Sequence, residues 1–239
     1  MHTATSHHTD HGASPGDDEP ILSQQFDDVE QQSEASMLGM WLFLATEVMF
    51  FGGLLTAYAV YRTTAPKEIA LASKELNVAL GCLNTVVLLT SSLTMALAVR
   101  ASQLRARREL VRWLLLTMVF GSAFLGIKAI EWTNDYHEDL IPGLNFQVPE
   151  KDRSLVDQEG LDPRKMELFF VLYFFMTGLH AIHLIIGIAL VGVMAWLSWR
   201  GWFSGGGATQ IEVTGLYWHF IDIVWVFLYP LLYLIDVHQ

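Results

Sequence analysis

The sequence contains a single cysteine, Cys82, which lies inside an apolar run. One cysteine cannot form an intrachain disulfide, and it excludes a metal site built from several thiolates. Basic residues are also scarce, since the formal net charge is −11 and residues 1–35 contain no Lys or Arg. This balance argues against nucleic acid as a partner, because nucleic-acid-binding proteins need basic surface. It also leaves the N-terminus without the basic region of a cleavable signal peptide, so we expect membrane insertion to rely on internal apolar segments.

The apolar residues, 52% of the chain, are gathered into long runs. Five runs come close to the ~20 residues that a membrane-spanning helix needs. The sequence therefore predicts an all-α fold, a polytopic membrane bundle of five transmembrane helices. We expect the spans at about 37–61, 76–99, 110–132, 167–198 and 215–236. The fourth run is too long for one perpendicular span, which indicates a tilt or an extension into the membrane interface.

Residues 1–35 form a polar, acidic segment that is rich in His, Gln and Ser. Such a composition is typical of a disordered tail. We therefore divide the chain into a tail, 1–35, and a membrane domain, 36–239. The tail contains His2, His7, His8 and His11, which we expect to be solvated rather than to form a metal site.

The loops indicate an orientation. The loop at 100–109 holds four arginines, Arg100, Arg105, Arg107 and Arg108. Positive charge favours the cytoplasmic side, so this loop and the N-terminus are predicted to be cytoplasmic and the C-terminus periplasmic. The loop at 133–166 is acidic on balance and is interrupted by Pro and Gly, which excludes a long helix there.

The last span carries a histidine and a carboxylate at helical spacing. His219 and Asp222 are three residues apart, so they share a face and can touch. Trp218 and Trp225 fall on the same side. Polar groups are costly in hydrocarbon, which makes this stretch a candidate functional site, but such pairs also hold helices together. Both interpretations remain open on these residues alone.

Two other spans contain carboxylates. Glu47 lies roughly 15 Å along the first helix, counting ~1.5 Å per residue from Met37. It must be neutral or paired there, either facing a proton path or bonded to a neighbouring helix. In the third span, Lys128 and Glu131 are three residues apart and can neutralise each other, and Trp132 suits an aromatic belt.

The fourth span places His180, His183 and Gly187 in one stripe. Two such histidines suggest a haem or copper site, because imidazole is a common metal ligand. However, histidines at i and i+3 of one helix cannot supply opposite axial ligands to one haem. His219 begins the next, antiparallel span and should lie at a different depth. We therefore do not expect these histidines to form a metal or haem site.

Taken together, four motifs resemble subunit III of haem-copper respiratory oxidases. They are Trp41 with Glu47-Val48-Met49-Phe50-Phe51, Phe124 with Glu131-Trp132, Thr177-Gly178-Leu179-His180-Ala181-Ile182-His183, and Tyr217-Trp218-His219-Phe220-Ile221-Asp222-Ile223-Val224-Trp225. The resemblance runs from about residue 36 to the C-terminus. Five spans correspond to the short bacterial form of the family. One departure is Lys128, where the family more often has Gln.

The resemblance implies an accessory subunit without a redox centre, in a proton-pumping oxidase that reduces oxygen to water with electrons from cytochrome c or quinol. The haems and copper would belong to subunit I, the main partner, with subunits II and IV as further partners. The chain would lie in the bacterial inner membrane, stabilise subunit I, support proton uptake and bind phospholipid. No residue of this chain is expected to be catalytic in the strict sense.

The family's polar positions map onto this sequence as Glu47, Glu131, His180, His183, His219 and Asp222. Trp41, Trp132, Trp218 and Trp225 are expected to face lipid or an interface. With the resemblance in view, the His219–Asp222 stretch is better interpreted as a buried polar clasp than as a reactive site. Two alternatives remain, a subunit-III-like partner of a nitric oxide reductase and a haem b membrane anchor.

Overall fold

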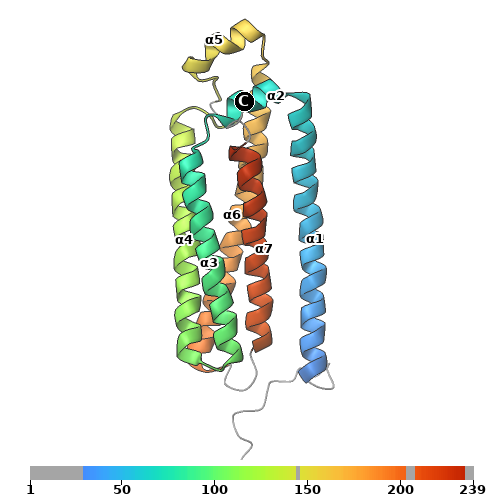
Figure 1. The fold of residues 1–239 in the computed structure, drawn as a ribbon, viewed down its shortest axis with the longest axis vertical. Coiled ribbons are helices and arrows are strands. Elements are labelled where there is room, and N and C mark those ends of the chain that lie inside the picture. Colours follow the sequence, from blue (N-terminus) through green and yellow to red (C-terminus); the bar gives the residue numbers. More distant parts are fainter. Residues whose placement is uncertain (1–28, 144–145, 203–207, 235–239) are drawn as a thin grey trace, which may run out of the picture.

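A computed structural model describes residues 29–143, 146–202 and 208–234 of the chain. Seven helices make up the ordered elements of this described part (Figure 1). They are α1 (Val29–Thr64), α2 (Pro66–Ser73), α3 (Val78–Gln103), α4 (Arg107–His137), α5 (Glu150–Glu159), α6 (Pro163–Arg200) and α7 (Ala208–Tyr233). Five of them, α1, α3, α4, α6 and α7, are long and apolar enough to cross a membrane, which confirms the five predicted spans.

The five long helices run roughly side by side along the long axis of the molecule (Figure 1). Helix α7 is the most buried and packs against α3, α6 and α1, while α4 packs against α3 and α6. Helix α1 stands at the edge of the bundle and is the least buried span. The core therefore lies between α3, α4, α6 and α7, and α1 is attached to it from one side.

The helix ends differ from the expected spans. Helix α1 begins at Val29, so residues 29–35 are helical, although we placed them in a disordered tail. The tail histidines lie outside the described residues. The fourth span was expected to be long, and α6 has 38 residues. The short helices α2 and α5 were not predicted, because runs of eight and ten residues carry little periodic signal.

Local sequence explains several helix ends. The Asn77 side chain accepts a hydrogen bond from the Leu80 N–H at the start of α3, and Asp162 does the same for Arg164 at the start of α6. Helix α6 ends at Gly201, whose φ of 86° suits a residue without a Cβ. These caps fix where the bundle helices begin and stop.

The short helices α2 and α5 lie together at one end of the bundle (Figure 1). Lys165 of α6 bonds Glu68 of α2 at 3.1 Å, and Lys67 of α2 bonds Glu159 of α5 at 2.8 Å. Burial raises the pKa of Glu68, but hydrogen bonds from backbone N–H groups and from Lys165 outweigh it, so that the net pKa lies below the ordinary value. The opposite end holds the turn between α3 and α4 and the C-terminal end of α6.

Candidate functional site

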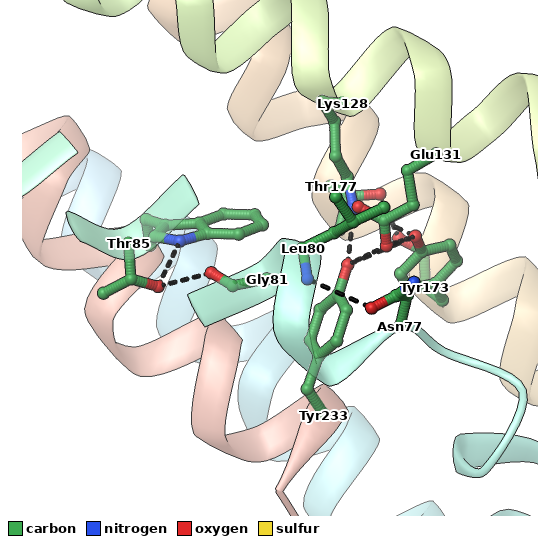
Figure 2. A network of polar contacts seen from close by, with 10 residues as sticks. Asn77, Leu80, Gly81, Thr85, Lys128, Glu131, Tyr173, Thr177 and Tyr233 are labelled. Carbon is green, nitrogen blue, oxygen red and sulfur yellow. Dashed lines mark hydrogen bonds and ion pairs between the residues drawn. The ribbon is translucent and has the colours of Figure 1, made fainter. Parts of the chain in front are cut away.

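A buried ion pair lies between α4, α6 and α7. Lys128 Nζ lies 3.1 Å from Glu131 Oε2 and donates to the hydroxyls of Tyr173, at 2.9 Å, and Tyr233, at 2.6 Å. Both hydroxyls lie within hydrogen-bonding distance of Glu131 Oε1, at 3.0 and 2.5 Å. Figure 2 shows the four side chains converging from three helices. Lys128 and Glu131 are each 2% exposed, so the expected i,i+3 pair is confirmed and is removed from both lipid and water.

Aromatic rings complete the surroundings of the ammonium group. Lys128 Nζ lies 4.8 Å from the ring centre of Tyr173, 5.3 Å from that of Tyr233 and 5.4 Å from that of Trp225. Ring faces attract cations, most strongly where water is excluded. An ion pair survives in a low-dielectric interior when its remaining donors and acceptors are also satisfied. These contacts therefore supply what a bare Lys–Glu pair would lack.

Sequence reasoning missed three members of this cluster. Tyr173 and Tyr233 are separated from Lys128 by 45 and 105 residues along the chain, so helical spacing could not reveal them. Asp135 is buried one turn beyond Glu131, and its i+4 position was a signal that could have found it. Trp132, expected in an aromatic belt, is half-buried and packs on Phe174, with ring centres 6.0 Å apart.

A second polar pair joins α1 to α6. His183 Nε2 lies 3.2 Å from Glu47 Oε2, and His183 Nδ1 lies 2.9 Å from the carbonyl oxygen of Leu179. A carbonyl only accepts, so Nδ1 must carry its proton. The Nε2–Glu47 contact then holds one proton, either on a neutral Glu47 or on a charged His183. The pair is electrically neutral in both states, which suits a partly buried position within the membrane.

The histidine stripe of α6 is divided between two neighbours. His183 faces α1, and its ring lies 5.3 Å from that of Phe51. His180 is 1% exposed and lies between the rings of Phe124, at 5.5 Å, and Trp225, at 5.2 Å. Gly187 meets α7 at Ile221 and Trp218. The two histidines thus belong to different helix contacts rather than to a shared ligand set.

Helix α7 is joined to α3 by a row of side-chain bonds. His219 Nδ1 lies 2.8 Å from the Ser92 hydroxyl, whereas neither oxygen of the buried Asp222 carboxyl has a hydrogen-bond partner among the described residues. We had expected His219 to bond Asp222. Within the described part of the chain, its hydrogen bond instead runs to Ser92. The clasp links two helices instead of two turns of one helix.

The tryptophans of α7 correct another expectation. Trp218 and Trp225 are fully buried, and their indole N–H groups donate to Ser91 and Thr85, each at 3.1 Å. They do not face lipid, because they fill the space between α7 and the neighbouring helices. Trp41 of α1, in contrast, is 58% exposed, as a lipid-facing residue would be.

Among the described residues, no group of three or more His, Cys, Asp or Glu side chains could hold a metal ion. Within the described structure, four of the predicted polar side chains, Glu47, Glu131, His183 and His219, instead take part in three helix-to-helix links. These are Lys128–Glu131 with its tyrosines, Glu47 with His183, and His219 with Ser92. The chemistry available to them is proton sharing and charge neutralisation inside a bundle.

Residues 27–138 and 167–237 match the family described as Cytochrome c oxidase subunit III. The Quinol oxidase subunit 3 of Bacillus spizizenii is 27% identical, over 87% of this chain and 93% of that protein. The Cytochrome c oxidase subunit 3 of a Synechocystis species is 30% identical, over 83% of this chain and 75% of that protein. The Cytochrome bo(3) ubiquinol oxidase subunit 3 of Pseudomonas aeruginosa is 27% identical, over 83% and 84%.

Proposed function

Because this chain belongs to the cytochrome c oxidase subunit III family, we propose that it is an accessory subunit of a proton-pumping haem-copper terminal oxidase. The complex would reduce oxygen to water, with cytochrome c or quinol as electron donor. The match over 27–138 and 167–237, which covers all five spans, is the observation that carries this proposal. The chain itself would hold no redox centre.

The contacts of the three membrane histidines favour a structural role for this chain. His183 bonds Glu47 and the Leu179 carbonyl, and His219 bonds Ser92, so each contributes to a contact between helices. His180 is enclosed by aromatic rings. Side chains in these positions stabilise the bundle, which would pack as a rigid unit against a catalytic partner.

The main partner would be oxidase subunit I, which carries the haems and copper, with subunits II and IV alongside. Bound phospholipid would cover the outer surface of the bundle, where large apolar side chains of α1 and α6 are exposed. We place the complex in the bacterial inner membrane. The arginine-containing turn between α3 and α4 would be cytoplasmic, as would the N-terminus, and the end of α7 would be periplasmic.

Purification of the tagged, full-length chain from its native membrane tests this proposal. We expect a haem-copper subunit I to co-purify in stoichiometric amount. After selective removal of this chain, the haem absorption of the remaining complex should be unchanged. A Soret band that leaves with this chain would contradict the accessory role, and absence of subunit I would contradict the oxidase assignment.

Cytochrome c and quinol both fit this proposal as electron donor, because relatives named cytochrome c oxidase and quinol oxidase share similar identity with this chain. The same names favour an oxidase over a nitric oxide reductase. A haem b anchor would need two axial histidines around one plane, and the contacts of His180, His183 and His219 point to three different neighbours.

A further inference from the structure

A surface pocket lies at the end of the bundle opposite α2 and α5. It is lined by Arg107, Arg108, Val111, Arg112 and Trp199. The first four belong to the N-terminal turns of α4, and Trp199 belongs to the last turn of α6. Three arginines thus surround one depression where two membrane-spanning helices end.

Arg107 forms the fixed wall of this pocket. Its Nε donates to the Ser198 carbonyl at 2.8 Å, and a terminal nitrogen donates to the Trp199 carbonyl. These carbonyls belong to the last turn of α6, where backbone donors become scarce, and the Ser198 carbonyl also accepts the Gly201 N–H at 3.1 Å. The guanidinium therefore ties the end of α6 to the start of α4 and sets the shape of the pocket.

Arg108 and Arg112 supply the accessible charge. Both are exposed, and Arg112 bonds Glu109 at 2.7 Å in a pair whose side chains are 71% and 49% exposed. An ion pair this exposed contributes little and exchanges readily. The charge of the lining side chains is therefore positive, and it lies beside the N-terminal end of α4, which also favours anions and has no side-chain cap.

The position of the pocket indicates the ligand. Three exposed tryptophans, Trp196, Trp199 and Trp202, lie at the same helix end, and the Arg200 guanidinium lies 4.5 Å from the ring centre of Trp196. Tryptophan at the end of a span marks the level of the lipid headgroups. Basic pockets between membrane helices at this level bind phosphate-bearing headgroups.

We propose that Arg107, Arg108, Arg112 and Trp199 form a binding site for the phosphate group of an anionic phospholipid. Arg108 and Arg112 hold the phosphate, Arg107 keeps the pocket open, and the Trp199 ring lies against the upper part of the acyl chains. Arginine suits this role because its planar donors match phosphate oxygens in pairs. The site gives a location and a headgroup chemistry to the phospholipid proposed above, and in that respect it rests on the proposed function.

Lipid selectivity of the intact complex tests the site. The purified oxidase is reconstituted in phosphatidylcholine with trace spin-labelled phosphatidylglycerol or phosphatidylcholine, and the motionally restricted fraction is measured. We expect the wild-type complex to prefer phosphatidylglycerol. Arg108→Gln combined with Arg112→Gln should lower that preference roughly twenty-five-fold, since each arginine near the surface contributes about fivefold. If the double variant does not assemble, Arg108→Gln alone should lower the preference for phosphatidylglycerol about fivefold.

Arg100→Gln combined with Arg105→Gln is the matched control. It removes two exposed arginines at the same end of the bundle but outside the pocket. An equal loss in this control would show diffuse attraction and overturn the proposal. Stronger displacement by inorganic phosphate than by chloride at equal ionic strength would assign the site to free phosphate instead. Haem content is measured in each sample, so that a failed lipid site is distinguished from a failed oxidase assignment.

Discussion

Lys128 is a charged side chain at a fully buried position, and its stability there depends on its neighbours. Glu131 neutralises it, Tyr173 and Tyr233 accept hydrogen bonds from it, and three ring faces surround it. Removing one member of such a group leaves the others without partners. The cost of losing a partner therefore exceeds the net contribution of the intact pair.

The variant Lys128→Met tests this dependence. It leaves the Glu131 carboxylate buried without a cation, so we expect a loss of about 3–5 kcal/mol in the free energy of unfolding. Thermal unfolding of the purified complex in detergent should show a clearly lower midpoint for this subunit. Adding Glu131→Leu removes the stranded charge and should recover most of the loss.

Lys67→Met is the control for that experiment. Lys67 pairs with Glu159 in the described structure, but its side chain is 70% exposed. Such an exposed pair contributes little to stability, so the midpoint should hardly change. Equal effects of the two lysine variants would show that burial of Lys128 has no energetic consequence.

Glu47 and His183 offer a second test at residue scale, because they join α1 to the rest of the bundle. We expect Glu47→Leu and His183→Leu each to weaken this attachment. Their combined effect should fall short of the sum by roughly 0.6 kcal/mol, the average for polar pairs in membranes, with an upper value of ~1.7. Unfolding of the two single variants and the double variant measures this coupling. Strict additivity would mean that the 3.2 Å contact is not energetically significant.

At the scale of the helices, the packing around α4 depends on Gly121, which faces the side chains of Trp218 on α7 and Ile188 on α6. A Cβ at this position would lie 2.8 Å from Trp218 Cη2, and Trp218 is fully buried. Gly121→Ala should therefore cost about 1–3 kcal/mol in the free energy of unfolding. Gly126→Ala, on the same helix, meets nothing within 4 Å and should leave stability unchanged or slightly raised. The thermal midpoints of both variants test this. Equal losses would show that stability depends on glycine itself and not on the contact between Gly121 and Trp218.

The attachment of α2 to α6 should depend on pH through Glu68. The net pKa of Glu68 is lowered, because backbone N–H bonds and Lys165 outweigh the effect of burial, which raises it. A carboxyl with a lowered pKa stabilises the fold above its unfolded pKa of roughly 4.3 and loses that contribution as pH falls below it. Glu68→Gln should therefore lower the unfolding midpoint at neutral pH, and the difference from wild type should vanish in acid. Glu159→Gln, at an exposed position, is the control. If the unfolding midpoints of Glu68→Gln and wild type still differed in acid, where Glu68 is protonated, the ionised carboxylate would be excluded as the cause.

Hydropathy predicted the five spans because each helix is apolar over about the thickness of a membrane. It could not place residues 29–35 in a helix, since their polar side chains carry no membrane signal. Nor could it tell which side of an apolar helix faces lipid, so Trp218 and Trp225 were wrongly assigned outward.

In the candidate site, contacts within one helix were predictable from the sequence and contacts between helices were not. Lys128 with Glu131 was predictable because both lie on one helix at i and i+3. Glu47 with His183 and His219 with Ser92 were not, because each pair joins residues more than a hundred positions apart. Partners on different helices depend on the order and rotation of the helices in the bundle. Local spacing contains no information about either.

At the scale of the whole molecule, the two ends of the bundle differ in kind. At one end, ion pairs join α2 to α5 and to α6, and the other end has the arginine pocket with its tryptophans. The proposed orientation places the arginine end in the cytoplasm, where positive loops are retained during insertion. It also places the headgroup pocket in the inner leaflet, so both proposals depend on the same direction of insertion.

Single cysteines on a Cys82→Ser background test this orientation. Asp157→Cys, on exposed α5, should react with a membrane-impermeant thiol reagent added to cells whose outer membrane is opened but whose inner membrane is intact. Arg105→Cys, exposed in the turn between α3 and α4, should react only after the inner membrane is permeabilised. The reason is that a single membrane-spanning helix, α4, lies between these two positions. The reverse labelling pattern would invert the molecule and place the arginine pocket in the outer leaflet, while reaction of both cysteines in intact cells would contradict a membrane-spanning α4.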